Sequence, residues 1–354
     1  MAPPKEEIFV AVTESTAAGK EVAHTQVRKL VRKTHLERVP PAVRYTLVIL
    51  SSLYLSSALF TLSSHITGEL ARVSKHFEAW WQVGGLVVWR AVEVGLMWVL
   101  GYNGRDVWTL AFLAHLPTYA LLVSFYNIRP TTMLLAYAIT VISTAAPFTL
   151  LRKPPTENES PRETPSNRAI THDCATTIYT TLAATSIFTV ALSLSYATWL
   201  PTHLVVHFDY LPDISVVHAG PNRLPVLFVS LLPAGLAARD FLFVKSTESA
   251  RSATDDDDSD DDTTDKAGKN KREGEYLACT VYHKMWGQLS PKTRVLVTRT
   301  ATLAGMLVLN TVVQVAGTVR GADVEGAAAW GGIWAAAAGA VGATYGWIEA
   351  VDGV

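Results

Sequence analysis

Residues 131–151, TTMLLAYAITVISTAAPFTLL, contain no charged side chain. A helix of about 20 mostly apolar residues is long enough to cross roughly 30 Å of hydrocarbon. Similar stretches recur along the chain, so the sequence predicts an all-α, polytopic integral membrane bundle of about eight transmembrane helices. The predicted spans are residues 43–65, 82–101, 106–127, 131–151, 174–199, 222–240, 295–318 and 326–348.

The overall composition agrees with a membrane protein. Only 17% of the 354 residues are charged, against about 25% in soluble proteins, and most of these lie outside the apolar stretches. The net charge of -1 and the absence of a basic patch interleaved with aromatic residues argue against nucleic-acid binding. The two cysteines, Cys174 and Cys279, form no Cys-x-x-Cys motif, so no disulfide framework or redox site is expected.

The distribution of basic residues predicts the orientation of the chain, because lysine and arginine favour cytosolic loops. Alternate loops on one side hold most of the 30 Lys and Arg residues. The opposite loops hold only Arg72, Lys75, Arg129, Arg223 and Arg320. Both termini should therefore face the cytosol. About forty mostly polar residues precede the first span, so we expect an uncleaved signal anchor in the endoplasmic reticulum or another secretory-pathway membrane.

These predictions divide the chain into alternating membrane and cytosolic segments. In chain order they are a cytosolic segment with a basic amphipathic helix (1–42), four spans (43–151), a disordered cytosolic loop (152–173), two spans around a luminal loop at 200–221 (174–240), a disordered acidic and basic cytosolic loop (241–294), two spans (295–348) and a cytosolic tail (349–354). The span at 222–240 contains Pro225 and Pro233. A surface position for that segment would reduce the count to seven spans.

The acidic loop contains two candidate phosphorylation sites. Ser252 and Ser259 each have an acidic residue three positions on, a pattern that resembles acid-directed kinase sites. A phosphate there would increase the negative charge of the loop. The alternative is a solvated linker with no binding partner.

Arg90 and Glu93 lie inside the predicted span at 82–101. A charge at the centre of a membrane helix costs roughly 2.5 to 3.5 kcal/mol on insertion scales. The spacing of three residues places both side chains on one helix face, where they can neutralise each other. One interpretation is an internal ion pair that fixes packing. The other makes the pair, with His115 of the next span, the polar core of a substrate or proton path.

Small residues in the last span recur at helical spacing: Gly332, Ala336, Ala340, Gly342 and Gly346. Such stripes let helix backbones approach closely. They predict packing within the chain or, alternatively, a homodimer through this span. Apart from the lipid bilayer, the expected partner is thus a second copy or another membrane protein.

The luminal loop carries the residues His203, His207, Asp209, Asp213 and His218. Imidazole and carboxylate groups are ordinary zinc ligands, so His203, His207, Asp209 and His218 are candidates for a metal site. The segment lacks the His-Glu-x-x-His motif of zinc hydrolases, and interfacial histidines can simply be surface residues. No cofactor is predicted beyond this zinc hypothesis.

No catalytic motif such as Gly-x-Ser-x-Gly occurs in the chain. The sequence therefore favours a non-enzymatic structural, adaptor or regulatory component of a eukaryotic endomembrane. The first alternative is a small-solute transporter that uses the polar site at Arg90 and Glu93. The second is a membrane-embedded lipid-modifying or metal-dependent enzyme that uses the luminal histidines.

Overall fold

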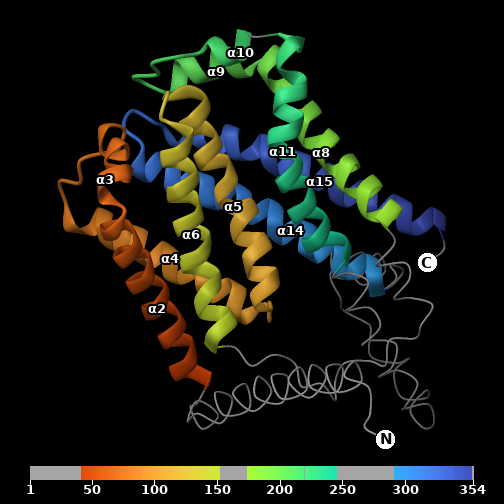
Figure 1. Ribbon diagram of the computed structural model, residues 1–354, viewed down its shortest axis with the longest axis horizontal. Helices are drawn as coiled ribbons and strands as arrows, with labels where there is room; N and C mark the ends of the chain where they lie inside the picture. Colours follow the sequence, from red (N-terminus) through yellow and green to blue (C-terminus); the bar gives the residue numbers. More distant parts are fainter. Residues whose placement is uncertain (1–40, 152–173, 219, 245–290, 353–354) are drawn as a thin grey trace, which may run out of the picture. The chain divides into compact units, whose positions relative to one another are not determined.

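The computed structural model describes residues 41–151, 174–218, 220–244 and 291–352 (Figure 1). The chain divides into two compact units, residues 1–48 and 49–354, and only the start of α2 is described in the first. The main helices are α2 (Pro41–Leu62), α4 (Trp80–Val99), α5 (Gly104–Phe125), α6 (Pro130–Leu151), α8 (Cys174–Ala197), α11 (Leu224–Arg239), α14 (Pro291–Thr311) and α15 (Val324–Asp352). Shorter elements are α3 (Ser64–Thr67), η2 (Gly68–Arg72), α9 (Leu200–His207), α10 (Ser215–His218), η3 (Pro221–Arg223) and the π-helical turns η4 (Asp240–Val244) and η5 (Val312–Ala316).

The predicted all-helical fold is confirmed for the described residues, which contain no strand and only two isolated β-bridges. Seven helices in the described part are long and apolar enough to cross a membrane. They correspond to the first seven predicted spans, including the proline-containing segment that begins at Leu224.

The eighth predicted span corresponds to α15, which is not among the seven helices. Its 29 residues would extend about 43 Å at 1.5 Å per residue. The helix is rich in alanine and glycine, which are less apolar than leucine, valine or isoleucine. Its membrane crossing, and with it the cytosolic position of both termini, stays a prediction.

Tight connections join α4, α5 and α6 in sequence. Gly101 has a φ of 76° and Asn127 a φ of 51°, left-handed values that favour these residue types at turns. Helix α5 begins with a capping box, in which Asn103 and Asp106 satisfy each other's backbone N–H groups.

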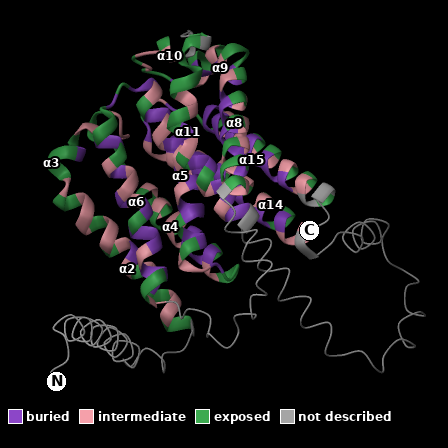
Figure 2. Ribbon diagram, turned by 45° about the vertical axis from the view of Figure 1, so that its right-hand side comes forward, coloured by how far each residue is buried: buried purple, intermediate pink, exposed green. Residues whose placement is uncertain are grey.

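The core of the second unit is built around α5. This helix packs against α6 and α14, while α15 packs against α14 and α8, and α8 packs against α11. Figure 2 shows buried residues gathered along α5 and a mixture of exposed and intermediate residues along α2. Buried aromatic side chains fill the contacts, and Trp330 of α15 donates a hydrogen bond from its indole nitrogen to the Pro117 carbonyl at 2.8 Å.

Several predicted features lie outside the described residues. These are the amphipathic helix at 20–39, the loop at 152–173, most of the loop at 241–294 and the candidate phosphorylation sites Ser252 and Ser259. They stay predictions.

Candidate functional site

Arg90 and Glu93 form an ion pair on α4, with Arg90 Nη1 2.8 Å from Glu93 Oε2. The Glu93 side chain is 1% exposed and that of Arg90 is 14% exposed. Since the residues are three apart on one helix, the pair forms without help from another element. An opposite charge at this distance offsets much of the cost of placing either group in an apolar surrounding.

Helix α5 brings a third titratable group to the pair. His115 is fully buried, and its Nε2 lies 3.6 Å from Glu93 Oε1 and 3.5 Å from Arg90 Nη1. Its Nδ1 lies 2.9 Å from the Ala111 carbonyl oxygen. A carbonyl only accepts hydrogen bonds, so Nδ1 carries a hydrogen and Nε2 is the atom free to gain or lose a proton.

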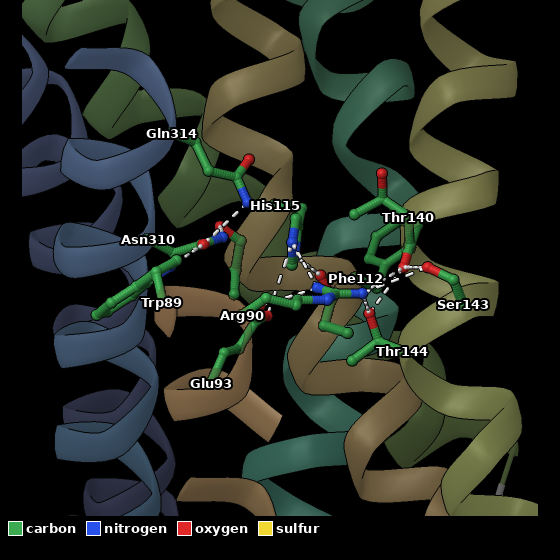
Figure 3. Close-up of polar contacts among 12 residues, drawn as sticks. Trp89, Arg90, Glu93, Phe112, His115, Thr140, Ser143, Thr144, Asn310 and Gln314 are labelled. Carbon is green, nitrogen blue, oxygen red and sulfur yellow. Dashed lines mark hydrogen bonds and ion pairs between the residues drawn. The ribbon is translucent and has the colours of Figure 1, made fainter. Parts of the chain in front are cut away.

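Helix α6 supplies hydroxyl groups to the other side of the guanidinium. Arg90 Nη2 donates to Ser143 Oγ at 3.3 Å and makes a short contact with Thr144 Oγ1. Figure 3 shows the Arg90 side chain extending between His115 and these hydroxyls. The sequence had suggested the Arg90, Glu93 and His115 group, and the structure brings all three together. The hydroxyl partners carried no recognisable sequence signal.

A second polar junction lies beside the first (Figure 3). Asn310 of α14 is fully buried, and its Oδ1 accepts hydrogen bonds from Trp89 Nε1 at 3.1 Å and Gln314 Nε2 at 2.9 Å. Its Nδ2 donates to the Ala114 carbonyl at 2.9 Å. Gln314 belongs to η5, a π-helical turn of a kind often found at functional positions. These contacts join α4 and α5 to α14.

Arg299 of α14 is the centre of a further cluster of polar and aromatic contacts, which the sequence analysis did not identify. Its Nη1 donates to the Phe241 carbonyl at 3.0 Å and lies 3.6 Å from Asp106 Oδ1. The guanidinium also stands over the rings of Tyr102 and Phe241 at 5.3 and 5.2 Å. Nearby, Arg239 bonds both Asp240 and Thr177. The signal available in the sequence was a lone arginine inside a predicted span.

A large cavity lies between helices of the second unit, and none of the residues of the first polar centre line it. It has a volume of about 520 Å³ between α5, α6, α8 and α11, and its wall is mostly apolar. Tyr119 and Tyr137 line it. The Tyr119 hydroxyl lies 2.7 Å from Thr140 Oγ1, and the Tyr137 hydroxyl donates to the Phe112 carbonyl. An apolar wall suits hydrocarbon better than a hydrated solute.

The predicted luminal metal group is only partly assembled. His203 and His207 share a face of α9, with ring centroids 4.2 Å apart. Asp209 follows α9 and is exposed, and His218 ends α10. The structure instead places two other carboxylates, Asp323 and Glu325, next to His207. Neither was a sequence candidate, because they are more than a hundred residues further along the chain.

The small residues of α15 fall on two faces. A Cβ at Gly342 would lie 3.0 Å from Thr300 Cβ, and Gly346 faces Leu296 of the same helix α14. By contrast, a Cβ at Gly332 would meet no atom within 4 Å, and Ala336 and Ala340 are exposed. The part of the predicted stripe at Gly342 and Gly346 therefore packs within the chain. The part at Gly332, Ala336 and Ala340 is open, and the homodimer prediction applies to that part.

Residues 173–313 match the family model described as the bouquet formation protein 3 C-terminal domain. The matched stretch begins at α8 and ends in η5, so it includes Asn310 and Arg299 but not Arg90, Glu93 or His115. No curated protein and no solved structure matches the chain.

Proposed function

We propose that this protein is a non-enzymatic, multi-pass structural or adaptor component of a eukaryotic endomembrane, and that this membrane is the nuclear envelope. Seven helices of the described part have the length and composition of membrane spans. The match over 173–313 is to a domain of a bouquet formation protein, a family associated with the nuclear envelope. That membrane is continuous with the endoplasmic reticulum, which is the membrane expected for an uncleaved signal anchor.

The observation that supports a structural role is that Arg90 contacts residues of three different helices. Its two terminal nitrogens contact Glu93, His115, Ser143 and Thr144, which belong to α4, α5 and α6. Only 22% of the apolar stretch of α4 is buried inside the protein. Packing of apolar side chains against other helices therefore holds α4 only weakly. The hydrogen bonds from Arg90 to α5 and α6 would hold α4 against its neighbours, and Glu93 would neutralise the guanidinium that makes them.

Localisation of the full chain tests this proposal. A fluorescent tag at the C-terminus should give a continuous nuclear rim in a eukaryotic cell, and the protein should stay in the membrane pellet after sodium carbonate extraction. A general endoplasmic reticulum protein with the same tag is the control for rim enrichment. Signal confined to the plasma membrane or another organelle would contradict the nuclear-envelope assignment, and extraction by carbonate would contradict membrane integration.

One observation favours a proton path as a second candidate function. Glu93 Oε1 is buried and has no hydrogen-bond partner, and it faces His115 Nε2 at 3.6 Å. One proton could be held between these two atoms, since each can bind it. Intramembrane carboxylate and histidine pairs are typical of proton relays.

Reconstitution separates the two functions. Proteoliposomes that enclose a pH-sensitive dye should acidify no faster than protein-free vesicles when an inward proton gradient and a potassium ionophore are applied. The matched variant is Glu93→Gln, which keeps the side-chain size and removes the titratable group. Proton flux in the parent that is absent from an equally monodisperse Glu93→Gln preparation would establish the proton path and displace the structural proposal.

A further inference from the structure

Two segments distant in sequence meet beyond the end of α9. Phe208 and Ala322 form an antiparallel β-bridge. On either side of it, the Asp209 N–H donates to the Gly321 carbonyl at 2.8 Å and the Asp323 N–H donates to the His207 carbonyl at 3.1 Å. These backbone hydrogen bonds fix the residue that ends α9 against the residues that lead into α15.

Glycine allows the two segments to approach this closely. Gly321 has a φ of 76°, and a Cβ there would lie 2.8 Å from Asp209 Cβ. A Cβ at Gly326 would lie 2.7 Å from His207 Cβ. Real Cβ contacts are longer than this, so a side chain at either position would push His207 and Asp209 away from the start of α15. The local sequence is thus suited to holding His207 beside α15.

The side chains that meet here have the spacing of metal ligands. His207, Asp323 and Glu325 each offer one ligand atom, and these atoms lie within 4.8 Å of one another. His207 Nδ1 is 3.5 Å from Asp323 Oδ2, which is longer than the 2.7 to 2.9 Å of a charge-assisted hydrogen bond. Two atoms that each lie about 2.0 to 2.1 Å from a tetrahedral zinc ion are separated by about 3.3 to 3.4 Å.

Two of the three ligand residues, His207 and Asp323, border a small polar hollow. It has a volume of about 330 Å³ and is lined by Val206, His207, Asp209, Gly321, Ala322 and Asp323. This leaves room for an ion and its bound water. Asp209 is exposed at the edge of the hollow and could supply a further oxygen. His203 Nε2, on the neighbouring turn of α9, is buried and has no hydrogen-bond partner.

We propose that His207, Asp323 and Glu325 form a divalent cation site that binds zinc, with water or Asp209 in the remaining position. An imidazole nitrogen combined with two carboxylates suits zinc, whereas calcium and magnesium take oxygen ligands. The bound ion would fasten α9 to the start of α15 and so join the fifth predicted span to the last helix. The site differs from the metal group predicted from the sequence. Two of its three ligands are Glu325 of α15 and Asp323, the residue before α15.

The test uses the full chain purified in detergent, stripped with EDTA and dialysed. Zinc chloride is titrated by calorimetry, and thermal unfolding is followed with and without zinc. We expect one zinc per chain and a higher melting temperature with zinc. Glu325→Gln and His207→Ala should each weaken zinc binding at least tenfold. Glu325 is exposed, so its variant should fold even if the histidine variant does not.

Two control variants match the ligand substitutions in chemistry. Asp213 accepts hydrogen bonds from the Ser215 N–H and hydroxyl at 2.7 and 2.9 Å, which hold the pKa of its carboxyl below the usual value. His65 is an exposed histidine of α3. Asp213→Asn and His65→Ala should bind zinc as the parent does. Absence of zinc binding by the parent, equal binding by the Glu325→Gln variant, or preference for calcium over zinc would overturn the proposal.

Discussion

Asn310 shows how single polar residues connect the helices of this protein. Its amide takes part in three hydrogen bonds, with Trp89 of α4, the Ala114 carbonyl of α5 and Gln314 of η5. Each of these groups would otherwise be a polar atom in an apolar surrounding. Asn310 is fully buried, so water cannot replace it as a partner.

Replacing Asn310 with leucine should therefore destabilise the fold. The change keeps the approximate side-chain size but leaves the Trp89 indole and the Gln314 amide without their acceptor, and a buried unsatisfied group costs about 1 to 3 kcal/mol. Thermal unfolding in detergent should show a lower melting temperature for Asn310→Leu. The control on the same helix is Thr298→Val, because Thr298 is exposed and its hydroxyl donates to the Arg294 carbonyl of its own helix. Equal melting temperatures for the two variants would contradict the role of Asn310.

Residue spacing predicted part of this polar architecture. Arg90 and Glu93 could be paired from the sequence because they are three apart on one helix. Their partners Ser143 and Thr144, and the contacts of Asn310, depend on how separate helices pack, which one sequence does not encode as a local pattern. The same reason explains why His207 was recognised as a ligand and its neighbours Asp323 and Glu325 were not.

At the scale of elements, α15 combines two kinds of contact. Gly331 and Gly342 lie against Val308 and Thr300 of α14, where an added Cβ would come within 3.2 Å of backbone or side-chain carbon atoms. Gly339 has no atom within 4 Å of such a Cβ. Periodicity predicted that small residues would face a helix, but only the structure distinguishes the face covered by α14 from the open face.

A pair of glycine variants tests this distinction. Gly342→Val should separate α15 from α14 and lower stability by about 1 to 3 kcal/mol, as expected for overpacking. Gly339→Val adds the same side chain on the open face and should leave the melting temperature unchanged. Crosslinking in membranes adds a second readout. If the open face forms a homodimer, Gly339→Val would reduce the dimer while Gly342→Val would not. Equal destabilisation by both variants would contradict the assigned faces.

At the scale of the whole molecule, the span count depends on α15. The long apolar helices were predicted well because each is continuous in sequence and needs no tertiary information. Helix α15 has the length of a span but a composition of small residues, so hydropathy alone does not decide its position. Its buried Trp330 and Trp334, together with its contacts to α14 and α8, favour a place within the membrane bundle.

Protease protection measures the number of crossings. With eight spans, tags at the N- and C-termini should both be digested in intact microsomes. With seven, one tag should be protected until detergent is added. The sequon at Asn158 provides an internal check, since a cytosolic position predicts that it carries no glycan. A protected C-terminal tag beside a digested N-terminal tag would contradict the eight-span topology.

The central claim is that the intramembrane charges serve the integrity of the whole protein. A double-mutant cycle on Arg90→Met and Glu93→Leu isolates their interaction. Removing both leaves local partners in place, because Ser143 and Thr144 also donate to the Thr140 carbonyl and His115 Nδ1 still contacts the Ala111 carbonyl. Removing one partner of a buried pair costs roughly 3 to 5 kcal/mol, so the single variants should be the worse folded.

The cycle is scored by monodisperse yield in detergent and by the nuclear-rim signal of the tagged chain. The account predicts that each single variant loses both, and that the double variant recovers most of both. Arg105→Met is the control, since Arg105 is 68% exposed and pairs with Asp240 at the surface. If both single variants and the double variant fold and localise like the parent, the charges are not needed for the structure, and the central claim is wrong.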